Sequence, residues 1–201
     1  MRLAAQHHDW ALGCADEVWW SRLQQPNLHS WAREGHALRL VEKYLPKRDP
    51  EPKALACYGL FLPKTETQDE QIWLRFATGQ PVSGITTQFL RWTCDQLAAQ
   101  GKTALLLIWD NASWHKSAEV RQWIRAHNRC VKQTGSGVRI LACLLPTQSP
   151  WLNPIEPKWV HGKRAVREPA RVLSAAELEA RVYAYSRCDP HPQLVISEKA
   201  A

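Results

Sequence analysis

The chain has 201 residues, of which 45% are hydrophobic, enough for one domain with a continuous core. It contains no run of about 18 uncharged apolar residues and no apolar N-terminal stretch, which argues against a membrane span or a secretory signal, so we expect a soluble cytoplasmic protein. Lys and Arg number 26 against 19 Asp and Glu, a net charge of +7 that favours polyanionic partners. Six single cysteines without CxxC spacing favour buried thiols over a disulfide framework or a zinc site.

The first third of the chain predicts an antiparallel meander. Short segments rich in aliphatic and aromatic residues, separated by turn residues, are typical of strands. A helix is expected after the meander, because Ile85, Phe89 and Trp92 recur at helical spacing and Gly101 is well placed to end it. The expected strands span residues 16–20, 30–32, 38–41, 54–61 and 72–76.

The middle of the chain alternates strands and helices. Residues 104–108 form a continuous aliphatic run, typical of a buried central strand, and a second run spans 140–145. Between them, Val120, Trp123 and Ile124 share one face of an expected helix. Strand, helix, strand in this order implies parallel pairing through a crossover. The sequence therefore predicts an α/β fold, a mixed sheet with an antiparallel meander followed by parallel strands, flanked by helices.

Two capping patterns predict the last helices. Asn153 as N-cap, with Pro154 at the first helical position and Glu156 at the third, opens one helix. Ser174 with Glu177 forms a capping box that opens the other.

The organisation expected from these elements is one domain over residues 1–188. Residues 189–201 begin with a proline-rich stretch and are expected to be a peripheral tail.

Three carboxylates from distant elements are candidate metal ligands. Asp110 follows a buried strand, where α/β folds place functional groups, although it could instead cap the turn. Glu156 lies in a first helical turn, which the helix dipole favours even without a metal. Asp16 and Glu17 are adjacent on a strand and point to opposite faces, so only one of them can join, and the local pattern does not choose. Three hard oxygen ligands of this kind suit magnesium and phosphoryl transfer.

Basic residues follow both Asp110 and Glu156 in the sequence. His115 and Lys116 come shortly after Asp110, where a histidine would contact a phosphate or a metal-bound water, or simply lie on a surface loop. The basic stretch after Glu156 predicts a track for a DNA backbone, the alternative being a solvated helix face. Its residues are Lys158, Lys163, Arg164, Arg167 and Arg171.

At these positions the chain resembles the transposase catalytic domains of the mariner superfamily, in the bacterial insertion-sequence branch that carries a DDE triad. The resemblance rests on three segments and extends from about residue 10 to residue 170, most of the chain. They are Ala15-Asp16-Glu17, Trp109-Asp110-Asn111-Ala112-Ser113-Trp114-His115-Lys116, and Leu145-Pro146 with Ser149-Pro150-Trp151-Leu152-Asn153-Pro154-Ile155-Glu156, of which the last is the most specific.

This resemblance implies an RNase H-like fold and a metal-dependent endonuclease and strand transferase acting in insertion-sequence transposition. It implies catalytic metal ligands at Asp16, Asp110 and Glu156, and so selects Asp16 over Glu17. Two Mg²⁺ ions are expected, for which Mn²⁺ could substitute. The implied partners are double-stranded DNA, both transposon ends and target, and a second copy in a homodimer. The implied location is the bacterial cytoplasm, in association with the nucleoid.

The chain departs from the family pattern at two places. The family separates its second and third acids by some thirty-odd residues, whereas here 45 lie between Asp110 and Glu156, and the Gly-Ser stretch at 134–137 is the natural place for the extra length. The family also carries helix-turn-helix domains upstream, and none is expected here, so a separate product bearing one is a further expected partner. Two alternatives remain at this stage: an RNase H-like nuclease that cuts without joining, and an inactive remnant or DNA-binding and assembly subunit.

Overall fold

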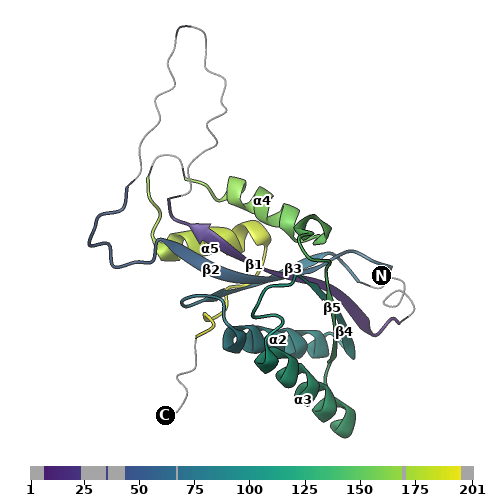
Figure 1. Ribbon diagram of the computed structural model, residues 1–201. Coiled ribbons are helices and arrows are strands. Elements are labelled where there is room, and N and C mark those ends of the chain that lie inside the picture. Colours follow the sequence, from purple (N-terminus) through teal and green to yellow (C-terminus); the bar gives the residue numbers. More distant parts are fainter. Residues whose placement is uncertain (1–6, 24–34, 36–43, 67, 169–170, 196–201) are drawn as a thin grey trace, which may run out of the picture.

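The computed structural model describes residues 7–23, 35, 44–66, 68–168 and 171–195 (Figure 1). Its sheet has five strands in the order β3-β2-β1-β4-β5. The strands are β1 (Trp10–Ser21), β2 (Ala54–Leu62), β3 (Gln71–Ala77), β4 (Ala104–Trp109) and β5 (Arg139–Leu144). Two of the expected short strands, at 30–32 and 38–41, lie outside the described residues.

Strand directions confirm the predicted mixed sheet. β1 pairs antiparallel with β2, and β2 antiparallel with β3. On its other side β1 pairs parallel with β4, which in turn pairs parallel with β5. The first strand therefore joins the meander to the parallel half, and its side chains reach both halves of the molecule.

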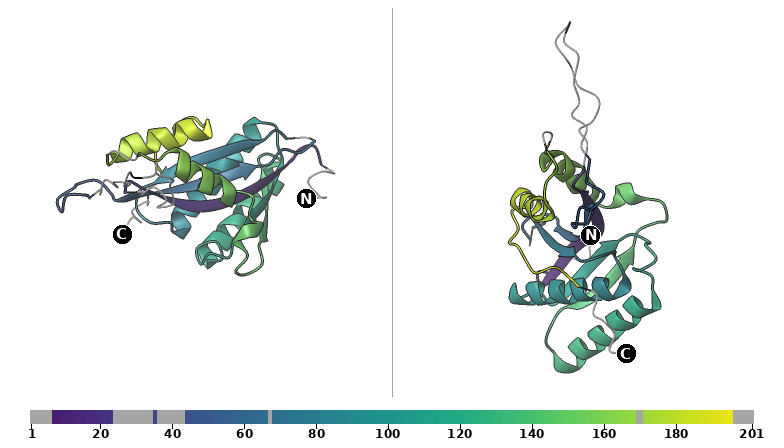
Figure 2. Two further views of the ribbon diagram at one scale, coloured as in Figure 1. Left: turned by 90° about the horizontal axis from the view of Figure 1, so that it is seen from above. Right: turned by 90° about the vertical axis from the view of Figure 1, so that its left-hand side faces the viewer.

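Helices cover both faces of the sheet (Figures 1 and 2). One face carries α2 (Ser83–Ala99) and α3 (Ala118–Thr134), and the other carries α4 (Glu156–Ala165) and α5 (Ala175–Ser186). A short 3₁₀ helix, η1 (Pro150–Leu152), precedes α4. No helix of the described chain is long and apolar enough to cross a membrane.

Each face of the sheet has its own core, because alternate residues of β1 point in opposite directions. Cys14, Val18 and Trp20 pack into the cluster under α4 and α5. Ala11 and Ala15 pack into the cluster under α2 and α3. Asp16 therefore belongs to the α4 face and Glu17 to the α3 face, as the predicted alternation requires.

Helix ends follow the local sequence, with one exception. The capping box of α5 is confirmed, since Ser174 Oγ accepts the N–H of Glu177 and the Glu177 side chain accepts the N–H of Ser174. Gly101 follows α2 with a φ of 74°, which suits glycine. The predicted N-cap of α4 at Asn153 is wrong: this helix begins at Glu156, with Ile155 as N-cap and no side-chain cap. Asn153 is bonded instead to the turn before the helix and to β1, as described below.

The C-terminal segment is less peripheral than expected. Leu194 is 4% exposed and belongs to the core beneath α2. Its backbone pairs with β3, because Leu194 N donates to Phe76 O at 2.7 Å and Thr78 N donates to Leu194 O at 2.8 Å. Arg75 also donates to the carbonyl of Pro192. Residues 189–195 thus form part of the domain, a role that one apolar residue in a polar stretch does not signal.

Candidate active site

Asp16 is fixed by a tryptophan from the opposite end of the sequence. The indole N–H of Trp159, in α4, donates to Asp16 Oδ2 at 2.9 Å. Asp16 pairs in register with Gly59 on β2. A Cβ at Gly59 would lie 2.3 Å from Cη2 of Trp159, so the missing side chain is what lets the indole ring approach β2 closely beside Asp16.

Asp16 lies in a concentration of negative charge. Burial raises its pKa to about 7, and repulsion from Glu156 and Glu17 acts in the same direction. The hydrogen bond from Trp159 opposes the shift without cancelling it. A carboxyl group with this environment is stabilised as an anion when a cation binds beside it.

Asp110 directly follows β4 and is bonded to a buried histidine. His115 Nδ1 lies 2.8 Å from Asp110 Oδ1, and His115 Nε2 lies 2.9 Å from Glu17 Oε1. The indole N–H of Trp114 donates to the other oxygen of Glu17 at 3.2 Å. His115 is 2% exposed and stacks on Trp109 at a ring separation of 4.4 Å. The imidazole thus links the end of β4 to β1.

The histidine in this bridge carries a proton on each nitrogen at neutral pH. Burial alone would lower its pKa, but the hydrogen bonds to Asp110 and Glu17 raise the pKa of His115 to about 9. The bond from His115 correspondingly lowers the pKa of Asp110. Each ring N–H then donates to one carboxylate, and the imidazolium offsets part of the negative charge of the site.

Glu156 opens α4 and is electrostatically coupled to both other acids. Burial raises its pKa, repulsion from Asp110 adds to the shift, and Lys163 opposes it. The charge of Glu156 raises the pKa of Asp16 in turn. Although the three carboxyl groups come from β1, the end of β4 and the start of α4, they lie close enough for each charge to influence a neighbour.

The start of α4 is tied to β1 by Asn153. Its side-chain amide donates to the carbonyl of Ala15 at 3.0 Å, and its Oδ1 accepts the N–H of Ile155 at 3.4 Å. Asn153 is 1% exposed, so these bonds are shielded from water. The amide therefore sets the position of Glu156 relative to Asp16, which explains why asparagine stands before the turn although it does not cap the helix.

The donor set suits a hard divalent cation, but the carboxylates are engaged elsewhere. Among the residues that the structure describes, no three His, Cys, Asp or Glu side chains are already arranged around one metal position. Asp16 faces Trp159, and Asp110 faces His115 and the N–H of Ala112. Each keeps oxygen lone pairs beyond these bonds, and oxygen donors are what Mg²⁺ prefers. The residues fit such an ion by chemistry and charge.

The predicted DNA-contacting residues differ in their surroundings. Lys116 and Arg164 are exposed, Arg167 is half-buried, and Lys163 lies near Glu156. His115 was expected to meet a phosphate or metal-bound water, but both its ring nitrogens are bonded to carboxylates and the ring is buried. In this structure it orients Asp110 instead.

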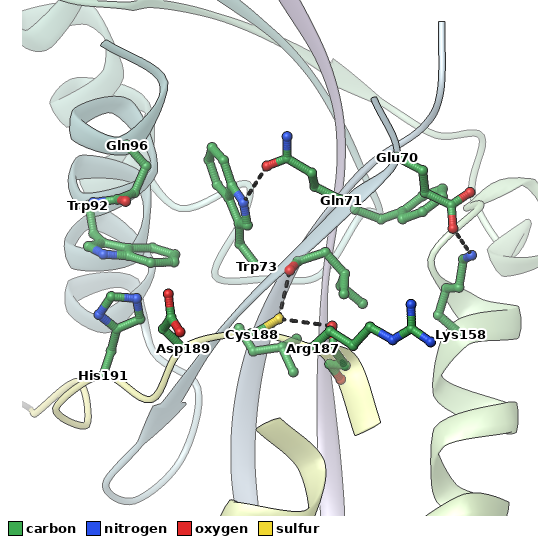
Figure 3. A pocket seen from close by; sticks show the side chains of 14 residues that line it. Glu70, Gln71, Trp73, Trp92, Gln96, Lys158, Arg187, Cys188, Asp189 and His191 are labelled. Carbon is green, nitrogen blue, oxygen red and sulfur yellow. Dashed lines mark hydrogen bonds and ion pairs between the residues drawn. The ribbon is translucent and has the colours of Figure 1, made fainter. Parts of the chain in front are cut away.

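Lys158 points away from the acids. Its ammonium group pairs with Glu70 at 2.6 Å and lies 4.7 Å from the centre of the Phe61 ring. Both contacts are at the rim of a cavity of about 400 Å³ between β3, α2 and the segment after α5 (Figure 3). Across that cavity Cys188 donates to the carbonyl of Ile72 at 2.7 Å. Lys158 therefore belongs to a different surface from Lys163.

Sequence reasoning missed the residues that hold the acids in place. Trp159, Trp114 and Gly59 were not singled out as residues that support the acids. Trp159 is 143 residues from Asp16 in the chain, and Trp114 is 97 residues from Glu17. Gly59 is about a hundred residues from the Trp159 ring that packs on it. The available signal was the high tryptophan count, 11 in 201 residues, which allowed some indoles a polar role.

Gly59→Ala is expected to destabilise the domain by about 1 to 3 kcal/mol, because the added methyl group forces the Trp159 ring off the sheet. Urea unfolding checks this, with Gly84→Ala as control, since a Cβ there meets no atom closer than 3.7 Å. Equal costs at the two glycines would contradict the packing argument.

The topology and the site together define the class of the protein. A sheet in the order β3-β2-β1-β4-β5 with helices on both faces is an RNase H-like fold, and the acids lie on its central strand, after the neighbouring strand and at the start of α4. Residues 66–179, more than half of the chain, match the DDE superfamily endonuclease family, and the chain belongs to that family. The matched segment contains Asp110 and Glu156.

Solved structures of one transposase share the fold. The Mos1 transposase paired-end complex with left transposon end matches with a TM-score of 0.59 at 12% identity, over 90% of this chain and 48% of that chain. The Mos1 strand transfer complex matches with a TM-score of 0.56 at 14% identity, over 91% and 48%. The Mos1 mariner paired end complex with Mn matches with a TM-score of 0.58 at 12% identity, over 90% and 49%. The chain thus spans about half the length of these proteins. No curated protein matches it by sequence.

Proposed function

We propose that this chain is the catalytic domain of a mariner-type DDE transposase of a bacterial insertion sequence, which cleaves DNA and transfers the cut strand with Asp16, Asp110 and Glu156 as metal ligands. The observation that carries the proposal is that these carboxyl groups come from three distant elements and yet lie near one another, Glu156 raising the pKa of Asp16 and Asp110 that of Glu156, in a chain of the DDE superfamily endonuclease family. Structural needs alone do not explain why acids that repel one another are gathered in one place.

A bound pair of Mg²⁺ ions, or Mn²⁺ in their place, would supply Lewis-acid stabilisation of the phosphate and a nucleophile activated at neutral pH. Asp16, Asp110 and Glu156 would hold these ions. Trp159 orients Asp16, and His115 orients Asp110 while compensating part of its charge. Lys163 offsets the charge of Glu156. The reaction is an in-line displacement at phosphorus by water or a DNA 3′-hydroxyl, with no covalent bond to the protein.

The proposed partners follow from the same chemistry. Double-stranded DNA, at the element ends and at the target, is the substrate, and the net charge of +7 favours its approach. The Mos1 structures include a paired-end complex with a transposon end. A homodimer would bring two ends together, and a separate helix-turn-helix product would recognise them. Association with the bacterial nucleoid is the corresponding location.

Product analysis tests the function. The whole chain is incubated with Mg²⁺ or Mn²⁺ and a labelled duplex, together with an unlabelled plasmid as target. Labelled strand joined to plasmid supports transposase chemistry. Cut duplex without joined product indicates a nuclease of the same fold, and DNA binding without any metal-dependent cut indicates an assembly subunit; either result contradicts the proposal.

A further inference from the structure

A groove runs between α3 and the free edge of β5, on the side of the sheet opposite α4. It consists of two hollows of about 580 and 320 Å³ that share Arg125. The first lies between the later half of α3 and the start of β5. The second lies between the earlier half of α3 and the end of β5, and Trp109 and His115 line it. Together the hollows follow much of the length of the helix.

The walls of this groove are positively charged. Six cationic side chains line it, all of them exposed: Lys116, Arg121, Arg125, Arg129, Lys132 and Arg139. None of the six forms an ion pair with any residue in the described ranges, and no Asp or Glu lines either hollow. The acid of α3, Glu119, points instead towards Gly84 at the start of α2. Apart from the electrostatic attraction between Lys116 and Asp110, the positive charge of the groove therefore has no direct partner among the described residues.

The spacing of the cations suits a nucleic-acid strand. Arg121, Arg125 and Arg129 are four residues apart, so they repeat along one helix face at about 6 Å. Phosphates on one DNA strand rise by about 3.4 Å each along the helix axis and are farther apart along the winding strand. Arginine donors are suited to phosphate oxygens. Between the cations the floor is apolar, with Ala142 and with Leu144 at 49% exposure.

The second hollow of the groove borders the candidate active site at Asp110, whereas Asp16 and Glu156 lie on the α4 side of the sheet. His115 lines its second hollow and is bonded to Asp110 at 2.8 Å, and Lys116 comes next in the chain. A strand lying in the groove would thus end beside Asp110. We propose that this groove binds the backbone of the duplex flanking the phosphate to be cut, with the arginines of α3 as its main contacts. The inference rests on the proposed function and adds a DNA path that is separate from the basic stretch of α4.

The test compares two triple variants that remove the same charge. In the first, Arg121→Gln, Arg125→Gln and Arg129→Gln change the groove. In the control, Lys47→Gln, Lys64→Gln and Arg91→Gln change exposed cations elsewhere. Binding to a labelled duplex of about 30 base pairs is measured in EDTA over a salt series, because each phosphate contact contributes about 0.9 to the slope of log K against log salt.

The groove variant is expected to bind at least about tenfold more weakly at about 0.1 M salt, with a slope smaller by about 2 to 3 than that of the wild type. The control should change the slope by less than about 1. Equal losses in the two variants, or unchanged binding in the groove variant, would overturn the inference. Binding of each variant to polyglutamate is measured in parallel. If the groove variant still binds DNA like the wild type but no longer binds polyglutamate, the inference is overturned in favour of an acidic protein partner.

Arg125→Glu serves as a second variant, because Arg125 lines both hollows, and it should weaken DNA binding more than Arg91→Glu. Thermal unfolding of each variant separates lost contacts from lost fold. Since these assays contain no free metal, they are independent of cleavage. Failure of the groove inference would leave the proposed chemistry standing, and an inactive wild-type chain that still binds DNA through the groove would contradict only the chemistry.

Discussion

Asp110→Asn and Glu156→Gln are each expected to lower metal-dependent DNA cleavage by at least about 10³-fold. Replacing a carboxylate by an amide keeps the shape of the side chain but removes the charge that holds a divalent ion. Lewis-acid stabilisation by such an ion is worth several kcal/mol, and about 1.4 kcal/mol corresponds to tenfold in rate. The measurement is the initial rate of cleavage of a labelled duplex with Mg²⁺ or Mn²⁺ in excess.

Asp95→Asn is the matched control, because Asp95 is an exposed acid on α2 away from the three carboxylates. It should cleave at the wild-type rate, and all three variants should bind DNA in EDTA like the wild type. A second readout follows the metal itself: Mn²⁺ should raise the melting temperature of the wild type and of Asp95→Asn, but not of the triad variants. Wild-type cleavage by Asp110→Asn or Glu156→Gln would contradict the metal-ligand assignment.

Much of the fold was predictable, because hydrophobic period and turn residues act locally. The aliphatic run at 104–108 became β4, and the helical spacing after Ser83 became α2. The start of α4 was not predictable from the same rules. Asn153 accepts the N–H of Ile155 through its side chain and the N–H of Glu156 through its backbone carbonyl, and its own side-chain amide donates to the carbonyl of Ala15 in β1. The residue that holds Asn153 in place is thus 138 positions away in the chain, where local rules do not reach.

The places of the three candidate acids in the secondary structure were predictable, but the contacts that support them were not. Asp110 was placed correctly at the end of a buried strand, since that position depends on the strand alone. The partner of His115 could not be read in the same way, because Glu17 reaches it only when β1 pairs with β4. A histidine near an acid in sequence suggests a surface loop, whereas the parallel pairing buries it between two carboxylates.

His115→Leu is expected to destabilise the domain by about 3 kcal/mol, as expected for removing one partner of a buried ion pair. The change removes both ring N–H donors at once. Glu17 is left 8% exposed with the indole N–H of Trp114 as its remaining described partner. Asp110 is 45% exposed and is better compensated by water. The uncompensated charge of Glu17 should therefore account for most of the decrease in the free energy of unfolding, which is measured by urea titration.

His127→Leu supplies the matched comparison for this change. His127 is half-buried on α3, stacks on Trp123 at 5.0 Å, and bonds through Nε2 to the carbonyl of Val138 at 2.8 Å, and neither of these contacts is with a carboxylate. Its loss should cost only about 1 kcal/mol. The double variant Glu17→Leu with His115→Leu should be less destabilised than the sum of its single changes, because removing the buried carboxylate removes the charge left uncompensated. Additive costs would show that His115 does not neutralise Glu17, and its place between β1 and β4 would then be a matter of packing alone.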